Sequence, residues 1–312
     1  MELFFRRAVD NITRHGDTDI FPFPIENHTF FDNADDVVAL LKRMNTDVRK
    51  SLATNPPQNV GALAPAGYSG FRWASQIDPI WNAAYLGWVL AAAEEIEKVR
   101  TPTGDERIFS YRYKWDDAEK TIFDKSIGWR QFTEKAVTKA QSSAYVVSCD
   151  ISEFYLRINH HRLENALRHL PGGDALAERI QPFLSSFSQT YSFGLPIGGP
   201  ASRILAELVL NQIDSLLIAE EVDFGRFVDD FYIFAEDPSK AFKSLVTLTR
   251  ILIENQGLQL QKSKTRIMKS AEFIASNPLH SDDADHAIEA PLGAARQAVM
   301  AVNLHFDPYS ST

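Results

Sequence analysis

Two acidic segments most constrain what this chain can fold into. Residues 144–155 read AYVVSCDISEFY and place Asp150 at the end of an apolar run. Residues 224–235 read FGRFVDDFYIFA and place Asp229 and Asp230 in the middle of another. An ionised carboxylate among apolar neighbours needs a cation or hydrogen-bond donors to offset its lost hydration. The fold must therefore bring such partners to both segments.

If the two segments lie together, their carboxylates form an oxygen-lined site suited to Mg²⁺ and a phosphorylated substrate. That is the chemistry of a nucleotidyltransferase, and it indicates a polymerase. We expect Asp150 and Asp229 to hold two Mg²⁺ ions, with Mn²⁺ as an alternative metal. Asp230 is expected either to bind a metal or to orient a residue that does. The competing interpretation is that all three are capping or turn aspartates, which any hairpin can supply.

Composition limits the classes of protein that remain. The chain has 312 residues, 45% of them hydrophobic and 23% charged, as in an ordinary globular protein. Its net charge of −9 argues against a protein that coats nucleic acid nonspecifically, although a local basic channel stays compatible with a polymerase. One cysteine, Cys149, excludes an internal disulfide and a CxxC zinc site. Without a membrane-spanning run or a signal-peptide pattern, we expect a cytoplasmic protein with no membrane partner.

The first part of the chain is predicted to be largely helical. Apolar periodicity indicates helices over residues 33–52 and 79–99, and over most of 115–142. Residues 53–70 are rich in Pro, Gly, Ala and Asn and are predicted to form a loop.

The pattern changes after residue 143. The predicted elements, in order, are a strand at 144–150, helices at 159–170 and 174–190, a turn at 194–200, a helix at 201–221, a hairpin at 224–235, a helix at 238–256 closed by Gly257, and a strand at 258–269. This order predicts an α+β fold, with an antiparallel sheet and helices on one face. It is the order expected of a polymerase palm.

Three regions are therefore expected in a right-hand polymerase arrangement. Residues 1–142 would form an N-terminal helical lobe and fingers, and residues 143–275 the palm. Residues 276–312 would form a C-terminal helical tail, with one helix over 286–303 and a minimal or absent thumb.

Four segments resemble the successive sequence blocks of reverse transcriptases, and they occur in that family's order. DISEFY at 150–155 resembles the first catalytic block. GLPIGGPASR at 194–203 resembles the block built around Pro-Gln-Gly, with Ile197 where many members have the glutamine. FVDD at 227–230 resembles the aromatic-x-Asp-Asp box, and GLQLQKSKT at 257–265 the later block with its lysine.

The resemblance implies roles for residues around the aspartates. The backbone carbonyl of Ile151 would be a further metal ligand. Tyr155 would collide with a 2′ hydroxyl and so favour deoxynucleotides, with core packing as the competing role. Gly198 would let the backbone approach the nucleotide or template, although an ordinary turn explains it equally. Lys264 would protonate or steady the leaving pyrophosphate.

Further residues are expected to contact phosphate. Ser202 and Arg203 lie in the first turn of a predicted helix, where the helix N-terminus favours an anion. Arg72 and Arg112 are the leading candidates for contact with the triphosphate from the fingers, because an arginine fork suits phosphate. For each arginine the competing interpretation is a solvated position on a helix face.

A finer resemblance links FRWASQIDP at 71–79 and SRILAE at 202–207 to the abortive-infection and related defence-associated reverse transcriptases of bacteria. It implies a role in antiphage defence, in which some members extend DNA without a template and prime on the protein itself. The expected partners are dNTPs, a DNA or RNA primer or template or a protein primer, and a homo-oligomer or helical partner domain.

Two alternatives stay open at this point. One is a templated enzyme of retron or group II intron type. Ile197 and the lack of any segment resembling a maturase extension count against the intron type. The other is a catalytically silent scaffold that assembles through the apolar helices at 79–93 and 201–218, against which the intact aspartates count.

Overall fold

The structure is a computed structural model, and it describes residues 1–18, 27–66, 70–187 and 192–277. The helix predicted over 286–303 lies outside these residues. None of the helices described within these ranges has the length and apolar character needed to span a bilayer.

Helix α5 (Pro79–Val99) confirms the helix predicted over 79–99, and it packs against several other helices. It begins where the Asp78 carboxylate accepts the backbone N–H of Trp81 at 3.1 Å, with a proline in its first turn. Gly87 lets α5 approach its neighbour closely, because a Cβ there would lie 2.4 Å from a ring carbon of Phe5. The helices that precede α5 are α1 (Glu2–His15), α2 (Asn27–Asp32), α3 (Ala34–Thr46) and α4 (Val48–Thr54).

The loop predicted over 53–70 is wrong. Strands β1 (Asn59–Ala66) and β2 (Gly70–Ile77) pair there as an antiparallel hairpin. The composition was misleading because a two-stranded hairpin tolerates residues that a larger sheet excludes. Each of its strands is an edge, so Pro65 can sit in β1 without removing a hydrogen bond that a further strand would need.

The prediction of helix over most of 115–142 is confirmed only for α6 (Trp129–Gln141). Before it, β3 (Tyr113–Asp116) and β4 (Thr121–Phe123) form a second hairpin. The Asp116 carboxylate closes the turn between them by accepting the backbone N–H groups of Ala118 and Glu119 at 2.8 and 2.9 Å. This local bond gives the backbone an alternative to a helix.

The later elements confirm the predicted α+β fold, with an antiparallel sheet and helices. The sheet has the order β6-β7-β5-β8, and each pair of neighbours is antiparallel. Its strands are β5 (Tyr145–Asp150), β6 (Phe224–Phe227), β7 (Asp230–Ala235) and β8 (Arg266–Lys269). The helices are α7 (Phe154–Arg157), α8 (His160–Arg168), α9 (Gly173–Phe187), α10 (Pro200–Ala219), α11 (Pro238–Gln256) and α12 (Ser270–Ala275), with short 3₁₀ turns at Thr103–Asp105 and Lys262–Lys264.

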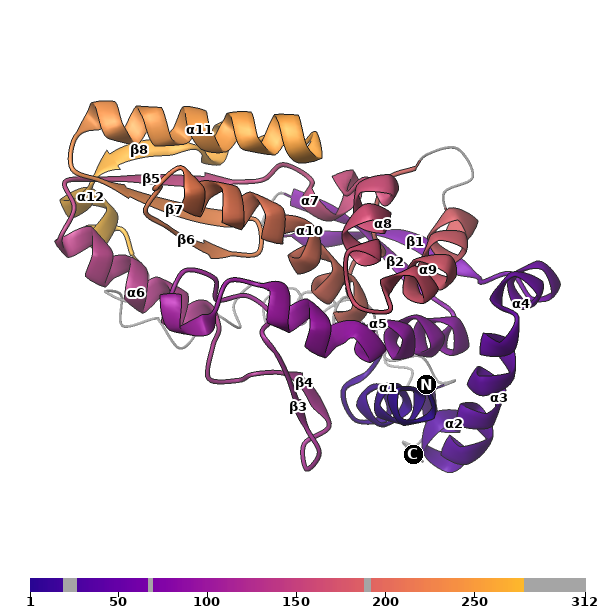
Figure 1. Cartoon of the computed structure of the whole chain (residues 1–312). Helices are drawn as coiled ribbons and strands as arrows, with labels where there is room; N and C mark the ends of the chain where they lie inside the picture. Colours follow the sequence, from indigo (N-terminus) through magenta and orange to yellow (C-terminus); the bar gives the residue numbers. More distant parts are fainter. Residues whose placement is uncertain (19–26, 67–69, 188–191, 278–312) are drawn as a thin grey trace.

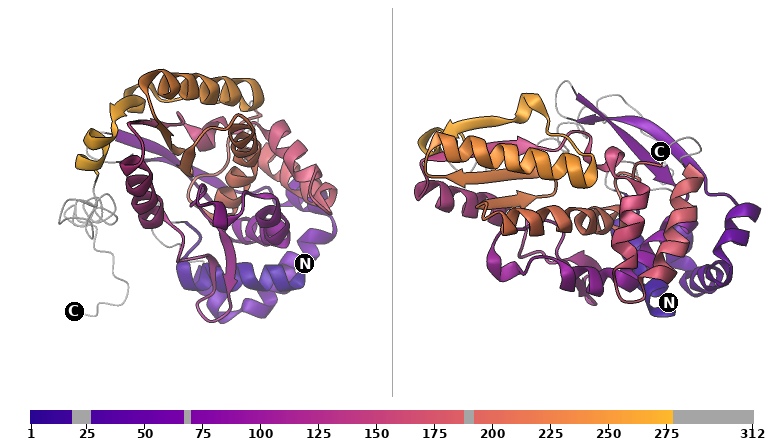
Figure 2. Two further views of the ribbon diagram at one scale, coloured as in Figure 1. Left: turned by 60° about the vertical axis from the view of Figure 1, so that its left-hand side comes forward. Right: turned by 45° about the horizontal axis from the view of Figure 1, so that its top comes forward.

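Two apolar layers cover the sheet (Figure 1). Helix α11 packs along one face, where Val147 and Ile233 join the main core. Figure 2 shows α11 lying along the strands. Helices α6 and α12 pack against the other face, where Val146 and Phe234 join a smaller cluster. Helices thus lie on both faces of the sheet, whereas the sequence predicted them on one. Because side chains alternate along a strand, Asp150 lies on the face of Val146, at the opposite end of β5.

Candidate active site

The pairing of β5 with β7 brings the two acidic segments together. Asp150 lies directly opposite Asp230 in the register, so the two side chains share one face of the sheet. Asp229 lies in the turn between β6 and β7, and its carbonyl accepts the N–H of Ile151 at 3.0 Å. The carbonyl of Asp150 accepts the N–H of Gln261 at 2.8 Å. Backbone hydrogen bonds thus hold residues far apart in the sequence at one corner of the sheet, which we call the acid corner (Asp150, Asp229 and Asp230).

Lys264 brings a cation to the acid corner. Its Nζ donates to Oδ2 of Asp150 at 2.5 Å. Partial burial lowers the pKa of Lys264, but the hydrogen bond and charge of Asp150, followed by the charges of Asp230 and Asp229, outweigh it and raise the pKa above its usual value. All three carboxylates therefore act on one ammonium. The Lys264 side chain is 61% exposed while that of Asp150 is 11% exposed, so the lysine reaches the carboxylate from the solvent side.

The acid corner fits a divalent cation by the chemistry of its donors. Carboxylate and carbonyl oxygens are the ligands that Mg²⁺ and Mn²⁺ prefer. The Lys264 ammonium already stands where such a cation would bind Asp150. Across the described residues, no three acidic, His or Cys side chains converge closely enough to form a finished metal site. Asp150, Asp229, Asp230 and the carbonyl of Ile151 are the groups that would hold the metal.

Tyr155 lies beside the acid corner at the start of α7. Its carbonyl accepts the N–H of Leu195 at 2.9 Å, which ties α7 to the segment before α10. Burial raises the pKa of the Tyr155 hydroxyl well above its usual value; Tyr111 raises it further, Arg203 lowers it, and Glu207 and Asp229 raise it. The Tyr155 hydroxyl therefore interacts electrostatically with both Arg203 and Asp229. The ring also packs on Phe154 at a centroid distance of 5.3 Å.

The turn before α10 and the first turn of that helix contain three of the predicted residues, Gly198, Ser202 and Arg203, and their outcomes differ. Gly198 has φ of 121°, a conformation that side chains disfavour, so this glycine is required by the backbone. Arg203 places its guanidinium 5.0 Å from the centroid of the Tyr111 ring, a cation–π distance. Ser202 is buried, with its Oγ 3.3 Å from the Tyr85 hydroxyl. We therefore reassign Ser202 from phosphate binding to the packing of α10 on α5.

The two arginines predicted to reach from the fingers also differ. Arg72 lies in β2, opposite Ala64 in the register, and its side chain lies outside the described part of the structure. Arg112 is buried: its Nε donates to Glu97 at 2.6 Å and its Nη1 donates to the carbonyl of Thr101 at 2.9 Å. Those bonds occupy the guanidinium inside the protein, so we correct Arg112 from a triphosphate contact to a structural residue.

Sequence reasoning missed Arg226, although a signal for it was present. Arg226 stands in β6, three residues before Asp229, inside the same apolar run that singled out the aspartates. A buried guanidinium needs partners as much as a buried carboxylate does. Those partners are Glu207 and Asp214, seven residues apart on the apolar helix α10.

A comparison with protein-family models finds a match. The family model described as reverse transcriptase (RNA-dependent DNA polymerase) matches residues 97–277, which is more than half of the chain and includes the whole acid corner. No curated protein sequence matches significantly.

Solved structures of telomerase are similar at low sequence identity. Telomerase from Candida albicans, in complex with a TWJ fragment of telomeric RNA, is 13% identical with a TM-score of 0.46, covering 81% of this chain and 50% of that one. Apo telomerase from Candida tropicalis is 11% identical with a TM-score of 0.43, covering 74% of this chain and 49% of the other. This chain thus spans about half the length of those telomerase chains. By its match over residues 97–277, the chain belongs to the reverse transcriptase family.

Proposed function

We propose that this chain is a DNA polymerase of reverse-transcriptase type, which adds dNTPs to a 3′ hydroxyl or to a hydroxyl of a protein primer by a two-metal mechanism. The observation that carries the proposal is the register of β5 and β7. It places Asp150 opposite Asp230, with Asp229 in the adjoining turn. Membership of the reverse transcriptase family supports the same chemistry.

The acid corner would hold two Mg²⁺ ions, or Mn²⁺ in their place. When bound, such ions lower the pKa of the attacking hydroxyl and neutralise charge on the triphosphate. Asp150, Asp229 and the carbonyl of Ile151 would be the ligands, and Asp230 would either bind or orient. Lys264 would leave Asp150 as the ions arrive. A lysine amine is protonated at neutral pH, so Lys264 would then be able to steady the charge of the leaving pyrophosphate.

The residues beside the acid corner would select and orient the nucleotide. The Tyr155 ring lies within the electrostatic reach of Asp229, where it would contact the sugar and exclude a 2′ hydroxyl. Arg203, steadied over the Tyr111 ring, would donate to phosphate oxygens. Gly198 would keep the backbone next to the substrate free of a side chain.

The test is incorporation of labelled dNTPs by the purified protein with Mg²⁺, with and without an RNA template and primer. Asp150→Asn is the matched control, because it removes the charge and keeps the shape. Label that runs with the protein and is released by protease indicates protein priming, and label that needs added RNA indicates a templated, retron-like enzyme. Equal incorporation by the wild type and the folded variant, or none by either, would contradict the proposal. The second outcome would favour the scaffold.

We further propose that the reaction serves antiphage defence. The support is the resemblance of residues 71–79 and 202–207 to the defence-associated members of the family. Expression in a phage-sensitive bacterium should lower the number of plaques, and Asp150→Asn should restore it. Equal protection by both proteins would separate any defence effect from polymerisation.

A further inference from the structure

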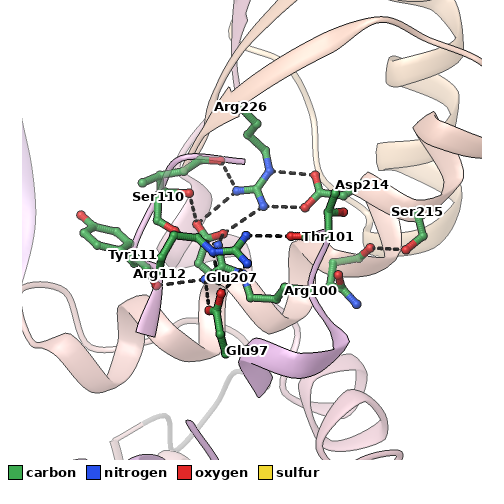
Figure 3. Close-up of polar contacts among 12 residues, drawn as sticks. Glu97, Arg100, Thr101, Ser110, Tyr111, Arg112, Glu207, Asp214, Ser215 and Arg226 are labelled. Carbon is green, nitrogen blue, oxygen red and sulfur yellow. Dashed lines mark hydrogen bonds and ion pairs between the residues drawn. The ribbon is translucent and has the colours of Figure 1, made fainter. Parts of the chain in front are cut away.

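Six charged side chains meet inside the protein, between the end of α5, the segment before β3, helix α10 and strand β6 (Figure 3). Three are arginines and three are acids, so their formal charges balance. We call this group the buried ion cluster; its members are Glu97, Arg100, Arg112, Glu207, Asp214 and Arg226.

Arg226 is the centre of the cluster. Its guanidinium donates to both oxygens of Asp214, at 2.8 and 2.6 Å, and to both oxygens of Glu207, at 3.1 and 2.9 Å. The side chains of Arg226 and Glu207 are 0% exposed. Two carboxylates on α10 therefore fix the plane of a guanidinium that belongs to β6.

The same guanidinium reaches the turn that carries Asp229. Nη1 of Arg226 also donates to the carbonyl of Val228 at 2.9 Å. Val228 has φ of 55°, a left-handed conformation that is costly for a β-branched residue by about 1–3 kcal/mol. Such a conformation persists only where the surroundings hold it. Because the Val228 carbonyl belongs to the peptide that leads into Asp229, this bond helps to set the orientation of that aspartate.

Arg100 forms a second arm of the cluster. It donates to Glu207 at 2.6 Å and to the carbonyls of Ser110 and Tyr111 at 2.7 and 2.9 Å. Tyr111 is also left-handed, with φ of 44°. Its ring is the one over which Arg203 lies. Each arm thus holds one strained, non-glycine residue directly beside a group of the proposed active site.

Stability alone is a poor explanation for this arrangement. Buried ion pairs lose hydration that their attraction barely repays, and apolar replacements are often as stable. What apolar side chains cannot supply is a directed hydrogen bond to a carbonyl at a chosen backbone position. The two arms end on such carbonyls, those of Val228 and Tyr111.

We propose that the buried ion cluster positions the reacting groups: Arg226 orients Asp229 through the Val228 peptide, and Arg100 orients Arg203 through Tyr111. This inference rests on the proposed polymerase function. Arg226 and Arg100 are positioning residues, since neither is placed against the substrate.

The two arms predict different kinetic defects, and Arg226→Lys and Arg100→Lys are a matched pair that test them. Both variants keep a buried positive charge and lose the fork. Arg226→Lys should lower kcat for dNTP incorporation about 10- to 100-fold and raise the Mg²⁺ concentration needed for half-maximal rate. Arg100→Lys should mainly raise KM for the dNTP. If the cluster serves only stability, each variant should lose activity in proportion to the fall in its melting temperature. The two variants would then show the same kind of kinetic defect, with no split between kcat and KM.

A rescue experiment isolates the Val228 peptide. Glycine adopts a left-handed conformation freely, so Val228→Gly removes the need for Arg226 to hold that residue. Added to Arg226→Lys, it should recover several-fold of the lost kcat. No recovery in a folded double variant would overturn the Arg226 arm.

A measurement without catalysis keeps this proposal separate from the proposed function. Mn²⁺ binding to the whole chain, followed by electron paramagnetic resonance, should weaken several-fold in Arg226→Lys and stay at the wild-type level in Arg100→Lys. If the wild type binds Mn²⁺ but incorporates no nucleotide, the proposed function fails and the effect of Arg226 on the metal site is still measured. If Arg226→Lys is folded and binds Mn²⁺ as tightly as the wild type, the positioning role is wrong. Should Arg226→Lys fail to fold, Asp214→Asn is the second variant, because it replaces one of the two carboxylates that fix the plane of the Arg226 fork. It must raise the half-saturating Mg²⁺, and an unchanged value would refute the proposal.

Discussion

The acid corner and the buried ion cluster both place charge inside the protein, and they treat their cations in opposite ways. In the cluster, Arg226 and Glu207 are completely buried. Both terminal nitrogens of the arginine donate hydrogen bonds to the carboxylate oxygens of Glu207. At the acid corner, the side chain of Lys264 is 61% exposed and joined to Asp150 by its tip. Another cation cannot reach the carboxylates that a buried arginine occupies. A cation from solvent can displace an exposed lysine from its carboxylate.

The comparison connects burial with role. Charges that must never move are enclosed and paired through rigid forks. In the proposed reaction a metal would replace the Lys264 ammonium, and this lysine is on a flexible stem at the surface. The first four of the following predictions test groups of the two regions, and the fifth probes the far face of the sheet behind the acid corner.

The largest effect is expected at the acid corner. Asp229→Asn should lower the rate of nucleotide addition more than a hundredfold, because a charged metal ligand contributes several kcal/mol to transition-state stabilisation. Its melting temperature should stay close to that of the wild type. Near-normal incorporation by a well-folded variant would refute the assignment of Asp229 as a ligand.

For stability, we expect the larger effect in the buried ion cluster and the smaller one at the acid corner. Glu207→Gln leaves buried arginines without a full counter-charge and should lower the free energy of unfolding by about 3–5 kcal/mol. Lys264→Gln removes a pair whose lysine is largely exposed, and it should cost less, about 1 kcal/mol. Urea unfolding measures both. Equal losses would show that the two regions do not differ in the way described.

The pH dependence of Lys264→Gln sharpens the same comparison. The folded-state pKa of Lys264 is raised above its usual value of 10.5. The stability it contributes is therefore fully present below pH 10.5 and is lost as the pH rises through the folded-state value. The difference between wild type and variant should be constant from neutral pH to pH 9. A difference that fades already near pH 7 would mean that Lys264 is not the group responsible.

Charges from both regions raise the pKa of the Tyr155 hydroxyl, after the larger effect of burial. They are Glu207 of the buried ion cluster and Asp229 of the acid corner. Tyr155→Ala should reduce the preference for dNTPs over NTPs by about 10- to 100-fold, because it opens space for a 2′ hydroxyl. Tyr155→Phe keeps the ring and should keep the preference. If the alanine variant selects sugars like the wild type, Tyr155 is a packing residue only.

The smallest effect concerns Cys149, which lies behind the acid corner on the other face of β5. Burial, and then the charges of Asp230 and Asp150, raise the pKa of its thiol to about 12. Iodoacetamide should therefore label the native protein slowly at pH 8 and the urea-unfolded protein quickly. Since burial is the larger cause, Mg²⁺ should leave the native labelling slow. Rapid labelling on adding Mg²⁺ would show that charge dominates, or that the sheet opens.

The sequence predicted most of the elements after residue 143, because each has a strong local signal. The strand predicted over 258–269 is confirmed only for β8 (Arg266–Lys269), which follows a 3₁₀ turn. The apolar runs around Asp150 and Asp229 specify buried strands, and Gly257 ends α11 in a left-handed conformation, as expected. The hairpin of β1 and β2 was missed because its Pro and Gly residues imitate a loop. In that hairpin, the pairing of the two strands overrides the local preference.

The candidate site was predictable in its acids and less so in its basic residues. Asp150 and Asp230 follow from pattern, and the structure places them in register. Arg112 was misplaced because sequence alone cannot distinguish an arginine directed to the substrate from one directed to Glu97. The buried ion cluster was missed because its members are spread from residue 97 to residue 226, and only the fold brings them together.

The strand order β6-β7-β5-β8 also governs how the protein acquires its activity. Pairing β5 with β7 joins segments separated by several helices, so it must close a long loop before any contact compensates. The backbone hydrogen bonds of helices such as α5 and α11 are local, so we expect these helices to form early. On dilution from urea, helical circular dichroism should thus recover first. Nucleotide addition should return only in the slowest phase, when the two acidic strands meet.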